Sequence, residues 1–150
     1  MKLTAKVKLL PTKAQVDSLK RTIETANQAC NYISDAAWLA KSFRQFDIHK
    51  LVYDDVRSAF GLTAQLAVRC IAKVADSYKI DKKTKREFRS AGSIPYDLRI
   101  LSWKIDDNYV SIWTVDGRQK IGFAVGDYQR KMLQSQRGET DLCLIDGEFY

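Results

Sequence analysis

The sequence predicts an α+β fold, in which a three-helix bundle is inserted after the first strand of a small antiparallel β-barrel. Three changes of periodicity predict it. Apolar residues alternate with polar ones over residues 2–10, recur at spacings of three and four over residues 12–78, and alternate again after Pro95. The expected parts are the first strand (1–11), the helical bundle with a basic linker (12–90) and the rest of the barrel (91–150).

The first helix has a clear start. Pro11 ends the preceding strand, and Thr12 with Gln15 forms the T-x-x-Q pattern of a capping box. Apolar residues then repeat at helical spacing, which predicts one long amphipathic helix over residues 13–41.

Two further helices are expected. One covers residues 47–60 and ends at Gly61, with Leu51, Val52 and Val56 facing the core. The other covers residues 63–78. Its polar side presents Gln65, Arg69 and Lys73 in one row, and such side chains can read base edges in a groove, although surface helices carry them routinely.

The last third alternates and is punctuated by Asp-Gly pairs, as hairpins are. We expect strands at 99–105, 109–115 and 118–125, a short helix at 127–136, and a hairpin joining 141–145 to 148–150. We place Trp38, Trp103 and Trp113 in the core, with one face of the 110–115 strand open to solvent.

The charge indicates a polyanionic partner. The net charge is +7, and residues 138–150 hold four acids and no base, so the remainder carries 25 − 14 = +11. No segment offers the apolar face and aromatic anchors of a membrane-surface helix. Three widely spaced cysteines, Cys30, Cys70 and Cys143, favour a reducing cytoplasmic setting over disulfides or a zinc site.

The linker 79–90 is the most basic segment, with six bases against two acids. Nearby Tyr78 and Phe88 could stack on unpaired bases while the charges hold phosphates. A solvated surface is the alternative for such a run. The candidate phosphate-binding residues here are Lys79, Lys82, Lys83, Lys85, Arg86 and Arg89.

Several phrases resemble one known family in order along the chain. They are KLTAKVKLLPTKAQ, ACNYISDAAW, IPYDLRILSWK, VSIWTVDGRQKI and MLQSQRGETDL. Together they resemble the N-terminal part of TnpB, the OrfB family of insertion-sequence elements, which is related to type V CRISPR effectors. The resemblance implies an RNA-guided DNA endonuclease whose OB-like wedge barrel and helical recognition domain grip nucleic acid.

The resemblance also implies partners and a division of labour. The partners are a guide RNA from the transposon end and target DNA, with backbone contacts from Arg99, Lys104, Arg118 and Lys120 in the strand block. Catalytic acids and Mg²⁺ would belong to a RuvC-like domain beyond Tyr150, so this chain is expected to hold no catalytic residue, metal or cofactor. It would be a fragment, a truncated gene product or one half of a split effector.

Two alternatives remain open. A nuclease-free regulator derived from the same family would bind nucleic acid alone. Arg44 and His49 form the degenerate R-x4-H pattern of HEPN ribonucleases, in which the imidazole acts at a scissile phosphate. A single histidine at a helix start more often only packs or donates a hydrogen bond.

Overall fold

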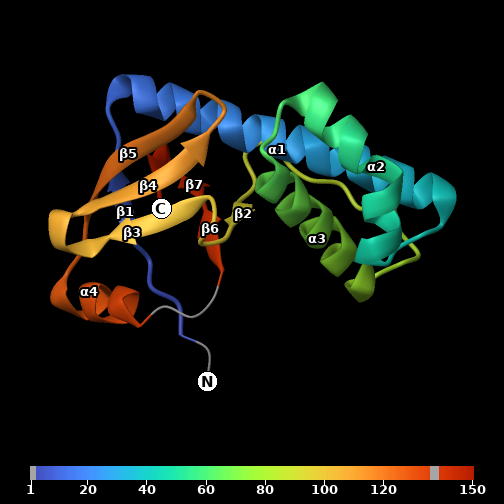
Figure 1. Ribbon diagram of the computed structural model, residues 1–150. Coiled ribbons are helices and arrows are strands. Elements are labelled where there is room, and N and C mark those ends of the chain that lie inside the picture. The colour runs from blue at the N-terminus through green and yellow to red at the C-terminus, as the bar shows by residue number, and fades with distance from the viewer. Residues whose placement is uncertain (1–2, 136–138) are drawn as a thin grey trace.

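The computed structural model describes residues 3–135 and 139–150. Two of the long helices lie at one end, the strands and the short last helix lie at the other, and the first helix runs along both (Figure 1). The elements are β1 (Lys8–Leu10), α1 (Lys13–Ala40), α2 (Gln45–Phe60), α3 (Ala64–Ile80), β2 (Ile94–Tyr96), β3 (Leu101–Lys104), the 3-10 helix η1 (Ile105–Asp107), β4 (Tyr109–Thr114), β5 (Gly117–Ala124), α4 (Asp127–Gln134), β6 (Thr140–Leu142), β7 (Leu144–Ile145) and β8 (Glu148–Phe149). The α+β class is confirmed.

Local signals set the ends of the three long helices. Thr12 and Gln15 form the predicted capping box, with the Thr12 amide donating to Gln15 Oε1 at 3.0 Å. Gly61 ends α2 with φ +64°, a left-handed conformation that glycine adopts without strain. The observed bounds of α1, α2 and α3 agree with the predicted ones to within two residues at each end.

The bundle core differs from the prediction on α2. Leu51 was expected to face inward, yet it is 48% exposed, and Ile48 is fully buried instead. Ile48, Val52 and Val56 are spaced by four residues and therefore share one face of the helix, whereas Leu51 is rotated away from it. These three residues pack with apolar side chains of α1 and α3 in one continuous core.

The largest sheet has four antiparallel strands in the order β1-β5-β4-β3. Its first strand was predicted over residues 2–10 but begins only at Lys8, and residue 2 lies outside the described ranges. Lys8 pairs with Ala124, the last residue of β5, so the segment before it has no neighbouring strand to pair with. Accordingly Leu3 is 60% exposed.

The described strands do not form the predicted small antiparallel β-barrel. In the described part of the chain the strands form three separate sheets, because β2 pairs with β6 and β7 pairs with β8. The outer strands β1 and β3 of the large sheet stay at opposite edges and do not meet. Strand β2 was not predicted. The short helix α4 ends at Gln134, and its predicted last residue, Gln136, lies outside the described ranges.

Helix α1 connects the two ends of the molecule. Near its start the Val115 amide of the β4–β5 turn donates to Thr22 Oγ1 at 3.0 Å. Near its end Ser34 Oγ lies 2.8 Å from the hydroxyl of Tyr78 on α3. The sheet and the bundle therefore share one helix. Within residues 3–135 and 139–150 no helix has both the length and the apolarity of a membrane span.

Candidate nucleic-acid interface

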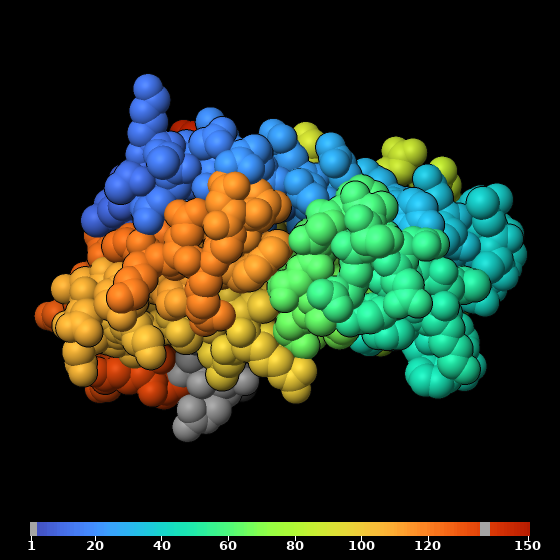
Figure 2. Space-filling model, turned by 45° about the horizontal axis from the view of Figure 1, so that its top comes forward, coloured from blue at the N-terminus to red at the C-terminus, as the bar shows by residue number. Residues whose placement is uncertain are grey.

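The outer side of the four-stranded sheet collects polar and aromatic residues. Along β4, Val110, Ile112 and Thr114 are buried, and the alternate residues point the other way. The register pairs Lys104 with Tyr109, Ser111 with Lys120, and Trp113 with Arg118. We call this surface the sheet face, and it consists of Ser102, Lys104, Tyr109, Ser111, Trp113, Arg118 and Lys120. The β4–β5 hairpin, in orange in Figure 2, lies uncovered at the surface of the molecule.

The sheet face is positively charged. The four strands contain Lys8, Lys104, Arg118 and Lys120 and no Asp or Glu. Lys8 is neutralised by Glu148 of β8 at 2.9 Å, and this hydrogen-bonded ion pair raises the pKa of Lys8 and lowers that of Glu148. The other three cations have no ion-pair partner among the described residues.

Arg118 is held in place by neutral acceptors. Its Nε donates to Ser111 Oγ at 2.7 Å, and its two terminal nitrogens reach the Arg99 carbonyl at 3.2 Å and Ser102 Oγ at 3.4 Å. These acceptors come from β4, from the segment before β3 and from β3 itself. The guanidinium therefore lies across neighbouring strands and keeps its charge uncompensated.

Arg99 joins the sheet to the bundle. Its guanidinium donates to Gln65 Oε1 at 2.9 Å, and Gln65 in turn donates to the carboxylate of Asp97. The predicted strand-block residue Arg99 and the predicted base reader Gln65 are thus brought together at the edge of the sheet.

The other two residues of the α3 row are also engaged inside the protein. Arg69 forms an ion pair with Glu139, and Lys73 donates to the Ser93 carbonyl at 2.5 Å. Lys73 also lies 5.2 Å from the centre of the Phe88 ring. The row therefore follows the seam between α3 and the strands, and its role in base reading stays a prediction.

The predicted basic linker is fastened along α1. We call residues 81–93 the strap. Asn27 donates to the Gly92 carbonyl at 2.8 Å, Asn31 exchanges hydrogen bonds with the Phe88 amide and carbonyl, and Ser34 donates to the Arg86 carbonyl. Asn27 and Ser34 are fully buried.

This polar stripe was not predicted. The sequence does carry a signal for it, because Asn27, Asn31 and Ser34 recur at helical spacing beside the apolar stripe of α1. Buried amides and hydroxyls at such positions require partners, and the strap backbone supplies them.

About half of the basic charge in this region is already paired. Lys79 pairs with Asp76 at 3.2 Å, Lys85 with Asp35 at 2.7 Å and Arg86 with Asp81 at 3.9 Å. In the described structure the side chains of Lys82, Lys83 and Arg89 have no such partner. Phe88 is half-buried beneath Lys73, so its ring is only partly accessible for stacking.

The three tryptophans are half-buried and pack against the core. Trp38 contacts Tyr78 and carries the Lys41 ammonium 3.4 Å above its ring. Trp103 meets Phe123 edge-on at 5.4 Å. Trp113 lies on the sheet face, which is the open side of β4, whereas the sequence had placed it in the core and had not indicated which side of the strand is open.

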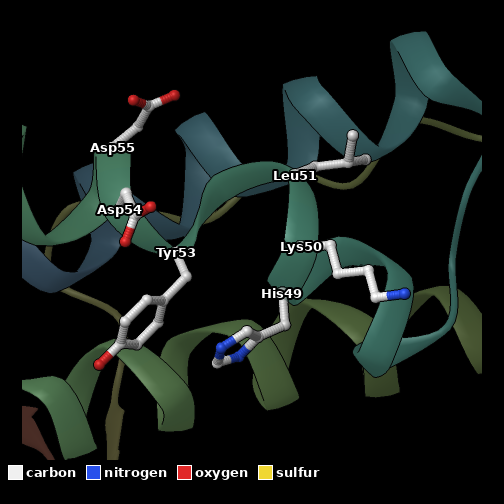
Figure 3. Close-up of a pocket in the computed structure, with 6 residues that line it drawn as sticks. All are labelled: His49, Lys50, Leu51, Tyr53, Asp54 and Asp55. Carbon is white, nitrogen blue, oxygen red and sulfur yellow. The ribbon is translucent and has the colours of Figure 1, made fainter.

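The structure does not bring Arg44 and His49 together. Arg44 caps α2 and pairs with Asp47 at 2.8 Å, whereas His49 stacks on Tyr53 with ring centres 4.5 Å apart. Five residues along a helix correspond to a rotation of about 140°, so the two side chains leave different faces. Figure 3 shows the His49 and Tyr53 rings side by side. They line a hollow of about 300 Å³, and all of its lining residues belong to α2.

Neither a metal-binding cluster nor a match to known proteins adds to this description of the site. Over the described residues no three His, Cys, Asp or Glu side chains gather as a metal-holding group. No protein-family model matches the sequence, and no curated protein matches it significantly.

Proposed function

We propose that this chain is the nucleic-acid-binding part of a TnpB-like, RNA-guided transposon nuclease. It binds a guide RNA from the transposon end together with target DNA, and cleavage belongs to a RuvC-like domain outside residues 1–150. The observation that carries the binding proposal is the sheet face, where Lys104, Arg118 and Lys120 stand on strands that contain no acid.

Unpaired surface cations favour a polyanion for a physical reason. A Lys or Arg without a nearby carboxylate attracts phosphates and releases their condensed counterions on binding. The charge of +11 outside the last thirteen residues adds long-range attraction of the same sign. Neither effect depends on base sequence, so these residues would position a nucleic acid and leave its sequence to be read elsewhere.

The resemblance supplies the more specific part of the proposal. Two of the phrases that resemble TnpB, residues 94–104 and 110–121, contain β2, β3 and most of β4 and β5, which include the strands of the sheet face. In this proposal the strands take the role of the wedge, and α1 to α3 take that of the recognition domain.

Salt-dependent RNA binding tests the binding proposal. The probe is a fluorescein-labelled transcript of the DNA that flanks the right end of the element, and affinity is measured by anisotropy over a series of salt concentrations. The variant Lys104→Ala/Arg118→Ala/Lys120→Ala should bind more weakly, and the slope of log affinity against log salt should fall by about 2, since each lost phosphate contact removes roughly 0.7.

A charge-matched control removes three lysines elsewhere, Lys20→Ala/Lys50→Ala/Lys131→Ala, all of them exposed. This control should retain the wild-type slope. Equal losses in both triple variants, or binding that salt does not weaken, would contradict the proposal.

The nuclease part of the proposal has a separate test. The genomic DNA after the Tyr150 codon should continue the reading frame into a RuvC-like domain with its metal-binding acids, or a neighbouring gene should encode one. A genome that contains neither would favour the nuclease-free regulator.

A further inference from the structure

The sheet face presents three flat side-chain groups in a row. Tyr109 and Trp113 lie on the same side of β4 with Ser111 between them, at a separation of about 13 Å for four residues of extended chain. The Arg118 guanidinium is bonded to Ser111 Oγ and Ser102 Oγ and so lies over the middle of this interval. The order along the surface is therefore a phenol ring, a guanidinium and an indole ring.

Arg118 is fixed without being neutralised, which sets it apart from the arginines that pair with acids. Arg21 binds Asp17 and Asp116, and Arg69 binds Glu139. Arg118 instead donates to two serine hydroxyls and two backbone carbonyls. A surface cation held in one orientation by neutral groups keeps both its charge and its planar faces for a ligand.

Each of the two aromatic rings has a cation on a neighbouring strand, which for Trp113 is its cross-strand neighbour Arg118. The Lys120 ammonium lies 5.4 Å from the centre of the Tyr109 ring, and Lys104 is the direct cross-strand neighbour of the same tyrosine. Rings that are partly exposed, set flush in a sheet and bordered by positive charge suit a ligand that offers both flat apolar faces and negative charge.

Unpaired nucleotides combine those two properties. A base in single-stranded RNA or DNA can leave its neighbours and stack on an aromatic ring or a guanidinium, while its phosphate contacts a lysine. In a duplex the base faces are stacked on one another and mainly phosphates are accessible. A duplex would therefore contact the cations but would not stack on Tyr109 or Trp113.

We infer that the sheet face is a stacking site for unpaired bases, with Tyr109, Arg118 and Trp113 as the flat surfaces and Lys104 and Lys120 as the phosphate contacts. The inference rests on the proposed function, because it assigns the kind of nucleic acid that this same surface takes. It predicts a preference for single-stranded over double-stranded segments.

The test compares one RNA in two states. An unstructured, fluorescein-labelled CA-repeat RNA is titrated with the full chain, alone and after annealing to its complement. Wild type should bind the single strand more tightly. Tyr109→Leu should lower single-strand affinity by roughly 5- to 150-fold, the range for loss of one base-stacking contact, and leave duplex affinity unchanged.

Matched variants separate stacking from folding. Tyr109→Phe keeps the ring and should bind as wild type does, and Arg118→Lys keeps the charge but loses the plane, so it should weaken single-strand binding alone. Tyr128→Leu removes a tyrosine of α4 that is 66% exposed, and it should change nothing. Thermal unfolding of each variant is measured alongside. If Tyr109→Leu is unfolded, the single-strand and duplex affinities of Arg118→Lys test the stacking site instead.

The outcomes are distinct. Salt-sensitive binding that is equal for both RNA states and equal in wild type, Tyr109→Leu and Arg118→Lys would overturn stacking and leave the proposed function standing. Binding of neither RNA, even at low salt, would overturn both.

Discussion

The strap and the sheet face are both basic, but their charges are held differently. The predicted basic segment 79–90 gathers six bases in twelve residues, yet Lys79, Lys85 and Arg86 are paired with carboxylates. The sheet face assembles Lys104, Arg118 and Lys120 from separate strands and leaves them unpaired. A run of basic residues in a sequence is therefore a weaker indication of a free positive surface than dispersed bases that a sheet brings together.

The two regions also differ in how the backbone is fixed. The sheet strands satisfy their amides and carbonyls by pairing with one another. The strap has no partner strand, and side chains of α1 bind its carbonyls instead. The strap should therefore depend on a few buried polar residues, and the sheet face should tolerate changes of single side chains.

The largest expected effect follows from this difference. Asn27→Ala removes the fully buried side chain that donates to the carbonyls of Ser90 and Gly92, and it leaves these part-buried acceptors without that donor. We expect the free energy of unfolding to fall by about 2 to 3 kcal/mol, measured by urea denaturation. The neighbouring Gln28→Ala, at an exposed position, should stay close to wild type. Wild-type stability in Asn27→Ala would mean that the strap is not fastened in this way.

A smaller effect is expected on RNA affinity, and it distinguishes the sheet face from the strap. Lys104→Ala/Arg118→Ala/Lys120→Ala should weaken RNA affinity by about tenfold or more, equivalent to ~1.4 kcal/mol. Lys82→Ala/Lys83→Ala/Arg89→Ala, which removes the strap cations without described ion-pair partners, should weaken it less. Anisotropy titrations at one salt concentration compare the two variants. The reverse ranking would make the strap the principal phosphate site.

The smallest effect concerns an acid in the turn between β4 and β5 of the large sheet. Asp116, in the β4–β5 turn, faces α1, where hydrogen bonds from Arg21 and Ser18 lower its pKa. A lowered pKa in the folded state stabilises the protein above the unfolded value of about 3.9, and this stabilisation is lost as the pH falls through the folded pKa. Asp116→Asn should therefore be slightly less stable than wild type at neutral pH, and the gap should close in acid. Thermal unfolding across that pH range measures it, and a gap that is constant with pH would contradict the ion pair.

Much of the helical part was predictable because its signals are local. Thr12 with Gln15 and Gly61 act within one turn of the chain, so the helix ends followed from sequence alone. Leu51 was misplaced because both Leu51 and Ile48 are compatible with an apolar stripe until the partner helices choose a face. Pairing of β2 with β6 links residues about 45 apart, and no local pattern indicates it.

The cations of the sheet face were among the predicted contact residues, whereas Tyr109, Ser102 and Ser111 were not, and Trp113 was assigned to the core. Arg118 and Lys120 are two residues apart on a strand, so their common side followed from alternation. The bond from Arg118 to Ser111 depends on the register of β4 with β5. The bond to Ser102 depends in addition on the register of β3 with β4, two strands joined by the η1 turn, where Asn108 has φ +56°. The Asn27 contacts could not be foreseen, because they join segments that the sequence separates by more than sixty residues.

Helix α1 also has a mechanical consequence. Its 28 residues make a rod about 42 Å long, with one end bonded to the β4–β5 turn and the other to α3 and the strap. A continuous helix that is bonded at both ends resists bending. The distance between the sheet face and the helical bundle is therefore fixed. A long, flexible polymer that contacts the sheet face and the bundle at the same time would have to span this fixed distance. The protein would thereby set the length of polymer between the two contacts.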